Sequence, residues 1–212
     1  MPSSSVADRR RYRGSSAEER RAQRREQLLE AAIRVYGEQG YRHATVKAVC
    51  EEAGLTERYF YESFSNSEEL LVASFQAVTH FLLGELEKAG VESRGDPLER
   101  ARAMLNAYYE TLKGNPRSAR VFLVEISGVS PTVDRALAVT LRAFGELLAR
   151  TLAPRGESSA ADEPLLRAGV VGGVIHIALN WIASGYSQPV REVVDAAVRL
   201  GSILNPGAAK SA

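Results

Sequence analysis

The sequence has almost no cysteine, and this excludes several kinds of protein. Cys50 is the only cysteine among the 212 residues, so the chain can form neither an internal disulfide nor a cysteine-based metal site. We therefore expect a cytoplasmic protein without a metal or a cofactor. Cys50 itself is expected to be a small buried hydrophobic residue.

Long hydrophobic runs and a large net charge are also missing. The most apolar run, residues 168 to 183, has 16 positions and includes His176 and Asn180, whereas a membrane-spanning helix needs about 20 predominantly apolar residues. We therefore expect no membrane partner and a helix buried inside protein. The N-terminal stretch lacks the apolar core of a secretory signal. The net charge is +1, so any polyanionic partner must be met by a local patch.

Positive charge is concentrated near the N-terminus. Residues 1 to 27 carry eight arginines against four acids, a net charge of +4. The first 20 residues are polar and lack periodicity, which predicts a disordered arm. This arm is either a solvated tail or a segment that contacts a polyanion.

Helical periodicity runs through the rest of the chain, and no segment alternates as a strand does. This predicts an all-α fold of about nine helices. After a helix that ends at Gly40, Thr45 caps a short helix closed by Gly54, and Thr56 caps another of about eight residues. Two such helices joined through a glycine have the proportions of a helix-turn-helix.

The later boundaries follow from capping and breaking signals. Asn66 and Glu69 form a pair like a capping box at the start of a fourth helix, which we place from residue 66 to about residue 89. Pro97 and Pro131 open further helices. We divide the chain into a basic arm (1–20), a helix-turn-helix domain (21–67), a helical effector-binding and dimerisation domain (68–205) and a flexible tail (206–212).

The stretch TVKAVCEEAGLTERYFYESFSNSEELL, preceded by a helix ending in YGEQGY, resembles the DNA-binding domain of the TetR family of transcriptional repressors. The residues in register with that family's pattern are Thr45, Ala48, Val49, Ala53, Gly54, Leu55, Thr56, Phe60, Tyr61, Phe64 and Leu70. The match covers residues 24 to 72, and beyond it the resemblance is one of architecture. It implies a regulator of transcription that binds double-stranded DNA and is not an enzyme.

The second short helix, residues 57 to 64, is expected to lie on DNA and is called the reading helix below. Residues of the helix-turn-helix are divided between a small core and the DNA-facing surface. Val49, Leu55, Phe60 and Phe64 are expected to form the core, which leaves Arg58 to donate two hydrogen bonds to a guanine. The candidate DNA-binding residues are Arg42, Thr45, Lys47, Thr56, Glu57, Arg58, Tyr59, Tyr61 and Ser67. The resemblance implies that the Tyr61 hydroxyl binds phosphate. The alternatives are that both threonines only cap helices, that Lys47 is a solvated charge, and that the tyrosines belong to the core.

Three residues depart from the family's pattern. Ser67 stands where the family usually has a lysine that binds a phosphate. Glu57 and Glu62 put negative charge on the reading helix, where phosphate would repel it, although Glu57 could accept from a cytosine amino group or favour the helix start. Our hypothesis is that arginines between residues 9 and 25 restore the missing attraction.

In the TetR family the last two helices of each subunit pair into a four-helix interface, and residues 168 to 183 fit that use. Gly169 and Gly173 lie one turn apart, which would let two helices approach closely, although an internal packing helix would look the same. The resemblance implies a homodimer through the last two helices, and a symmetric dimer requires a palindromic operator.

The middle helices are expected to enclose a pocket for a small hydrophobic or aromatic effector. Its candidate lining is Phe75, Thr79, Leu105, Tyr108, Tyr109, Phe122, Glu125, Leu141, His176 and Asn180. His176 is also consistent with a core or interface position, and Arg120 could satisfy Glu125. The family's common mechanism is repression relieved by the effector, with the fourth helix as the lever. The alternatives are an architectural DNA-binding protein without an effector, and an all-helical enzyme that uses Glu125 and His176.

Overall fold

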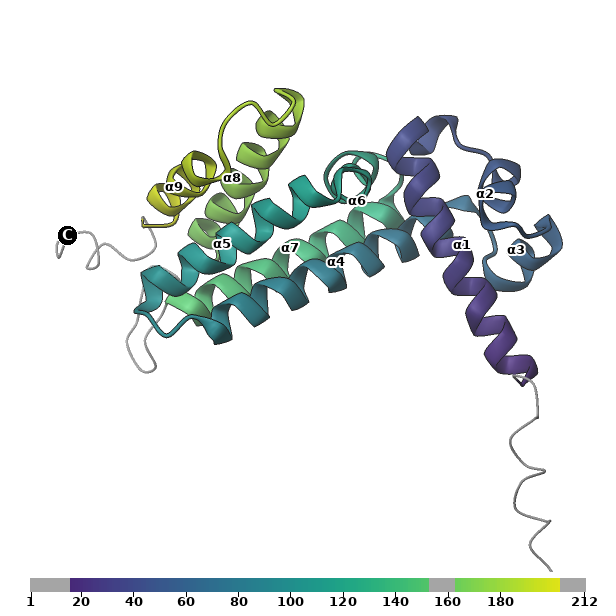
Figure 1. Ribbon diagram of the computed structural model, residues 1–212, viewed down its shortest axis with the longest axis horizontal. Helices are drawn as coiled ribbons and strands as arrows, with labels where there is room; N and C mark the ends of the chain where they lie inside the picture. Colours follow the sequence, from purple (N-terminus) through teal and green to yellow (C-terminus); the bar gives the residue numbers. More distant parts are fainter. Residues whose placement is uncertain (1–15, 153–162, 203–212) are drawn as a thin grey trace, which may run out of the picture.

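The chain folds as a small helical head at one end of an elongated helical body (Figure 1). The computed structural model describes residues 16–152 and 163–202, and within these ranges it has nine α-helices and no strand, which confirms the all-α prediction. The elements are α1 (Ala17–Gln39), η2 (Tyr41–His43), α2 (Val46–Ala53), α3 (Glu57–Ser63), α4 (Ser67–Glu92), α5 (Pro97–Gly114), α6 (Pro116–Arg120), η3 (Val121–Glu125), α7 (Pro131–Leu152), α8 (Pro164–Ala183) and α9 (Val190–Gly201).

Helix α1 starts earlier than its apolar periodicity predicts. Ser16 Oγ accepts from the Glu19 N–H at 3.0 Å, and the Ser16 N–H donates to Glu19 Oε2 at 2.6 Å, so the two residues form a capping box. The predicted disordered arm is therefore wrong for residues 16 to 20. Residues 1 to 15 of that arm lie outside the described residues.

Short-range signals place the two short helices of the head. Thr45 Oγ1 accepts from the Ala48 N–H at 3.1 Å, and Gly54 ends α2 in the left-handed conformation at φ 66°. Thr56 occupies the N-cap position of α3, but its side chain makes no capping hydrogen bond, so that part of the prediction is wrong. Phe60 and Phe64 are buried against α1 and α2, as expected of the core of a helix-turn-helix.

Helix α4 runs from the head along the whole body, beside α5 and α7 (Figure 1). Asn66 Oδ1 accepts from the Glu69 N–H at 2.8 Å, as the sequence predicts. The stripe of Leu71, Phe75, Val78 and Leu82 is buried. Helices α8 and α9 then pack across α5 and α7 on the other side of the body.

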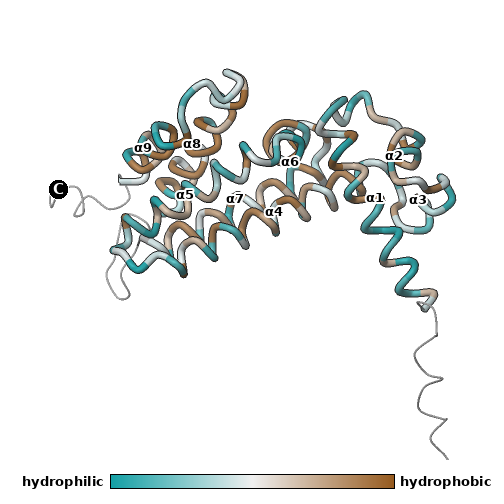
Figure 2. The backbone as a smooth tube through the Cα atoms, in the orientation of Figure 1, coloured by the Kyte–Doolittle hydropathy of each residue, from teal (hydrophilic) through white to brown (hydrophobic). Residues whose placement is uncertain are grey.

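Helix α8 differs from the other helices because its composition is mostly apolar although few of its residues are buried. Figure 2 shows brown, hydrophobic stretches along much of α8, with paler and teal parts between them. It is the one helix among the described residues that is long and apolar enough to cross a membrane, and 22% of it is buried. Its buried residues are Val170, Val171, Ala178 and Trp181. The expectation of a helix buried inside protein is therefore wrong for a single chain.

Candidate functional site: a helix-turn-helix head and two joined cavities

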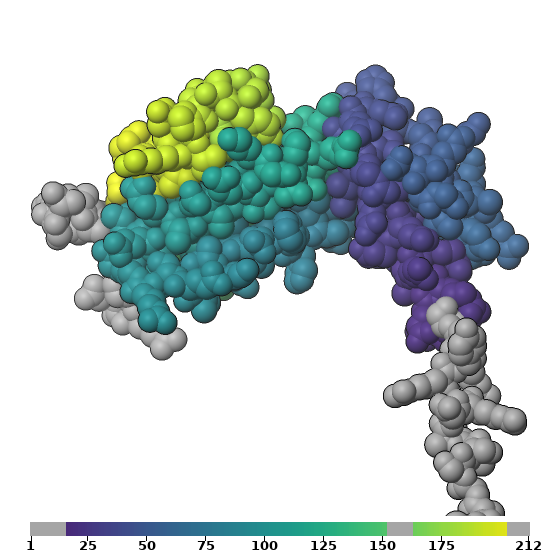
Figure 3. Space-filling view, viewed as in Figure 1, coloured from purple at the N-terminus to yellow at the C-terminus, as the bar shows by residue number. Residues whose placement is uncertain are grey.

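The candidate DNA-binding residues gather on the head, which Figure 3 shows as a lobe at one end of the molecule. Seven of the nine are exposed: Arg42, Thr45, Lys47, Thr56, Glu57, Arg58 and Tyr61. Tyr61 is 60% exposed and its ring lies edge-on to the buried Phe60, with 5.1 Å between ring centroids. Its hydroxyl is therefore free to contact DNA. Tyr59 and Ser67 are half-buried.

The negative charge of Glu62 is neutralised within the head. Arg58 Nε donates to Glu62 Oε1 at 3.0 Å, and Arg24 Nη2 lies 3.8 Å from Glu62 Oε2. Arg21 Nη2 also donates to the Glu62 backbone oxygen at 2.7 Å. The expectation that Glu62 repels phosphate therefore overlooked its partners. Exposed ion pairs contribute little, about 0 to 1 kcal/mol, so Arg58 can exchange Glu62 for a base at small cost.

Arginines of α1 pack on the aromatic rings of the reading helix and its end. The Arg24 guanidinium lies 4.4 Å from the centroid of the Tyr59 ring, and the Arg25 guanidinium lies 4.8 Å from that of Phe64. Both contacts are in the range of cation–π interactions. These arginines belong to a helix that supports the head, which differs from the predicted role of the arginines in attracting phosphate. The available signal was their helical spacing from Leu28.

The joint between head and body is built around Glu125, whose carboxylate is 10% exposed. Its Oε2 accepts from the Tyr41 N–H at 2.8 Å, and its Oε1 accepts from Arg120 Nε at 2.8 Å. Arg120 Nη1 also donates to the Glu38 backbone oxygen at 3.4 Å. Arg120 thus satisfies Glu125, which was the alternative to an effector contact, and Glu125 lies outside the linings of the cavities.

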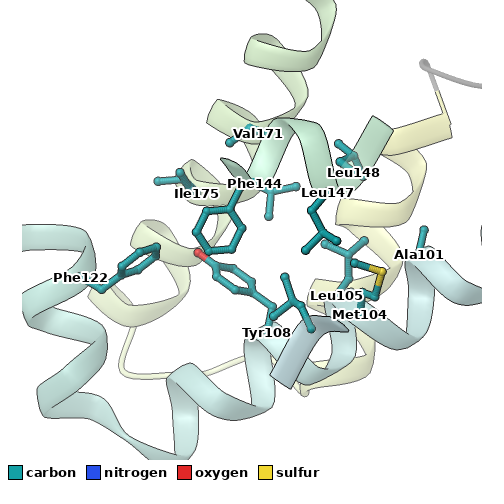
Figure 4. Close-up of a pocket in the computed structure, with 12 residues that line it drawn as sticks. Ala101, Met104, Leu105, Tyr108, Phe122, Phe144, Leu147, Leu148, Val171 and Ile175 are labelled. Carbon is teal, nitrogen blue, oxygen red and sulfur yellow. The ribbon is translucent and has the colours of Figure 1, made fainter. Parts of the chain in front are cut away.

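An apolar inner cavity of about 60 Å³ lies between α4, α5, α7 and α8 (Figure 4). Its lining is Leu86, Ala101, Met104, Leu105, Tyr108, Phe122, Phe144, Leu147, Leu148, Val171, Val174 and Ile175. Leu105, Tyr108 and Phe122 are on the predicted list. The others were missed because a leucine that lines a cavity has the same helical spacing as one that fills a core.

An outer cavity of about 390 Å³ lies between η3, α7 and α8 and adjoins the inner one. The two cavities share Phe122, Val171 and Ile175 in their linings. The predicted Leu141 lines the outer cavity, together with Arg142, Glu146 and Arg167. Neither arginine has an ion pair with another described residue. The cavities therefore offer a carbon-lined interior and an outer part with two cationic groups and one carboxylate.

The remaining predicted effector residues do not line these two cavities. Phe75 lies behind the wall and stacks on Phe122, with 5.6 Å between centroids and 12° between ring planes. Thr79 is buried, and the Tyr109 hydroxyl donates to the Val174 backbone oxygen at 3.1 Å. His176 and Asn180 are exposed on α8 and line a separate groove against α9. The predicted set was thus drawn from the right helices, but it mixed the faces of α8.

The arrangement of these parts defines a class of protein, a helix-turn-helix DNA-binding regulator with a cavity-bearing helical body. Residues 28–73 match the family model for bacterial regulatory proteins of the tetR family. The chain belongs to the TetR family of DNA-binding transcriptional regulators.

Relatives of known role are similar over most of the chain. The HTH-type transcriptional activator FasR of Mycolicibacterium smegmatis is 24% identical over 162 residues, 76% of this chain and 74% of that protein. The fatty acid metabolism regulator protein of Bacillus subtilis is 20% identical over 160 residues, 74% of this chain and 82% of that protein.

The fold is also that of solved regulators. The fatty acid degradation regulator FadR from Bacillus halodurans gives a TM-score of 0.72 at 19% identity, over 89% of this chain and 96% of that chain. The transcriptional regulator FadR from Bacillus subtilis in complex with stearoyl-CoA gives 0.71 at 18% identity, over 83% of this chain and 96% of that chain.

Proposed function

We propose that the protein is a homodimeric repressor that leaves a palindromic operator when an apolar effector fills the joined cavities. The observation that carries this proposal is the position of Phe122, which lines both cavities on the element, η3, that ends at the joint with the head. The head up to the start of α4 is then the DNA-binding domain, and α4 to α9 form the effector-binding and dimerisation domain of a cytoplasmic protein.

The effector that suits the cavities is an amphiphile with an apolar chain and an anionic head group, such as a long-chain acyl thioester. The inner cavity offers carbon atoms to the chain, and Arg142 and Arg167 in the outer cavity offer positive charge to the head group. The names of the relatives agree with this chemistry, since two concern fatty acids and one solved structure holds stearoyl-CoA.

The experiment that tests the function begins with an operator selected from random DNA by the purified protein. Palmitoyl-CoA is expected to release the protein from that operator in a gel-shift titration, and coenzyme A alone is not. In transcription from a promoter that carries the operator, repression relieved by palmitoyl-CoA supports the proposal. Activation, or DNA binding that no acyl compound changes, contradicts it, and the latter would favour an architectural protein. Turnover of the thioester would favour an enzyme.

The reading role of Arg58 predicts a loss of sequence discrimination. Arg58→Ala should weaken operator binding by about 1–3 kcal/mol, or roughly 5- to 150-fold, with a smaller effect on random DNA, because a bidentate contact to guanine is lost. Fluorescence anisotropy on both DNAs measures this. Arg94→Ala is the control, since Arg94 is exposed between α4 and α5, far along the chain from the head. Equal weakening on both DNAs would make Arg58 a phosphate contact instead.

A homodimer through α8 and α9 would cover the outward side of α8, where small side chains would let a second helix approach. That exposed face consists of Leu165, Gly169, Gly172, His176, Asn180 and Ala183. Gly173 packs inward, because a Cβ there would lie 2.3 Å from Leu200 Cδ2 of the chain's own α9, whereas a Cβ at Gly169 would meet nothing within 4 Å. Of Gly169 and Gly173, only Gly169 therefore leaves room for a second chain.

Gly169→Arg should convert the dimer into a monomer, because it puts a bulky charge within this face. Operator binding should fall with it, since each monomer reads only a half-site. Light scattering after size-exclusion chromatography measures the mass. Gly84→Arg is the matched control, because Gly84 is also an exposed helical glycine with nothing within 4 Å of its Cβ position. A Gly169→Arg dimer would place the interface elsewhere.

A further inference from the structure

One tyrosine hydroxyl in the wall of the inner cavity is buried without a partner. Tyr108 is 3% exposed, and its oxygen has no hydrogen bond among the described residues. A buried hydroxyl usually has a partner, because leaving it unpaired costs about 1–3 kcal/mol. The adjacent Tyr109 shows the usual arrangement, since its hydroxyl donates to the Val174 backbone oxygen. Tyr108 therefore has a hydrogen bond to offer to something outside the described chain.

This hydroxyl lies beside residues that line both cavities. Tyr108 comes from α5, and Figure 4 shows its oxygen turned toward Phe122, Phe144 and Ile175. Phe122 and Ile175 line both cavities. The ring is held edge-on by Tyr109, at 5.0 Å between centroids, and by Phe144, at 6.4 Å. The hydroxyl is thus held beside residues that both cavities share, a place we call the neck, where the neighbouring side chains cover its oxygen.

The charge of the surroundings selects the kind of group that this hydroxyl can receive. Burial raises the pKa of Tyr108 well above its usual value, so the hydroxyl stays protonated and remains a donor. No lysine, arginine or histidine lines the inner cavity. A carboxylate there would lose its hydration for one hydrogen bond and no counter-ion, which is unfavourable. A neutral carbonyl, by contrast, is satisfied by a single donor.

We infer that Tyr108 is a specificity-determining residue that donates a hydrogen bond to a neutral carbonyl of the effector at the neck between the cavities. This inference rests on the proposed function and makes it more specific. The apolar chain enters the inner cavity, which must widen beyond its 60 Å³ to hold all of a long chain. The carbonyl lies at Tyr108, and the anionic group lies beside Arg142 and Arg167 in the outer cavity. The protein thereby distinguishes an acyl ester or thioester from a free fatty acid.

The test compares ligands with and without the carbonyl on two matched variants. By calorimetry, wild-type protein should bind palmitoyl-CoA about tenfold more tightly than the thioether S-hexadecyl-coenzyme A, which lacks only the carbonyl, and should bind palmitate more weakly than palmitoyl-CoA. Tyr108→Phe should bind the thioester and the thioether equally. Tyr109→Phe is the control and should keep the tenfold ratio, because the Tyr109 hydroxyl is already bonded within the protein.

Stability gives a readout that is independent of the ligand. Tyr108→Phe should leave the thermal unfolding temperature of the ligand-free protein unchanged or raise it, because it removes an unpaired hydroxyl, whereas Tyr109→Phe should lower it. A lower unfolding temperature for Tyr108→Phe would show that its hydroxyl has a partner and would overturn the inference.

The outcomes separate the inference from the proposed function. If the affinity ratio of palmitoyl-CoA to S-hexadecyl-coenzyme A stays tenfold in Tyr108→Phe, only the role of Tyr108 is overturned. The same holds if palmitate binds as tightly as palmitoyl-CoA. Failure of all coenzyme A derivatives contradicts the proposed effector class. In that case undecan-2-one, which has a neutral carbonyl, is compared with undecane, which has none. If the protein binds these two compounds equally, or binds neither, the inference about Tyr108 is overturned as well.

Discussion

Phe60→Ala is expected to unfold the head and to abolish operator binding, while the body keeps its cavities. The Phe60 side chain is fully buried between α1, α2 and α3 and packs against the Phe64 ring at 6.0 Å between centroids. Truncating a buried phenylalanine costs about 3–5 kcal/mol. A three-helix head has a small core, and a whole domain is stable by only about 5–15 kcal/mol, so a loss of this size removes most of its stability.

Two measurements separate the head from the body in this variant. Thermal unfolding followed by circular dichroism should show a low-temperature transition for α1 to α3, and effector binding measured by calorimetry should persist. Tyr61→Ala is the control, because Tyr61 is the neighbouring aromatic residue and is 60% exposed. It should change stability by less than about 1 kcal/mol yet still weaken DNA binding. An unchanged unfolding profile for Phe60→Ala would contradict the assigned core.

The head could be predicted closely because local chemistry decides it. The Thr45 cap, the left-handed Gly54 and the Asn66 cap each act within a few residues, so their signals are present in the sequence. The start of α1 was missed because its first turns contain no buried residue, and only the capping box of Ser16 marks the position.

The site in the body could be predicted only in part because it depends on contacts far apart in the chain. Glu125 binds the Tyr41 N–H, 84 positions away, and nothing in either residue's neighbourhood in the sequence announces this pairing. The cavities are gaps left between side chains of four helices, and the spacing of apolar residues shows which helix face is inside but not where packing is incomplete. Tyr108 therefore could be placed inside, whereas its unpaired hydroxyl could not be foreseen.

Glu125→Ala is expected to uncouple effector binding from DNA binding. Phe122 lines both cavities and lies three residues before Glu125 in the π-helical turn η3, so a ligand that displaces Phe122 also moves the carboxylate that holds Tyr41. Tyr41 opens η2, which leads into the helix-turn-helix. Helix α4, the lever that the family resemblance implies, joins the same path because Phe75 stacks on Phe122.

The backbones of α1 and α6 touch beside this joint, which makes it sensitive to small changes. A Cβ at Gly37 would lie 2.6 Å from Arg117 Cα, and Arg117 Nη2 pairs with Glu38 Oε1 at 2.5 Å. Gly37→Ala must therefore push α1 away from α6, and it perturbs the joint without removing a charge. Both variants should reduce the coupling, Gly37→Ala by displacing the head and Glu125→Ala by releasing it.

Coupling is measured as the ratio of operator dissociation constants with and without saturating palmitoyl-CoA. Couplings of this kind are typically about 1–3 kcal/mol, or 5- to 150-fold, and the same ratio must appear in effector affinity with and without operator. In Glu125→Ala both ratios should approach one, while effector affinity without DNA stays as in wild-type protein. This reciprocal check distinguishes lost coupling from a damaged site, because a damaged site changes an affinity in the absence of the other ligand.

Glu52→Ala is the matched control for the loss of an ion pair. Arg34 Nε lies 2.5 Å from Glu52 Oε1, so this pair joins α1 to α2 within the head. It should lower stability slightly and leave the coupling intact. If Glu125→Ala keeps the full coupling and Glu52→Ala behaves in the same way, the signal does not pass through Glu125. The first turns of α4, which begin directly after the head, would then carry it alone.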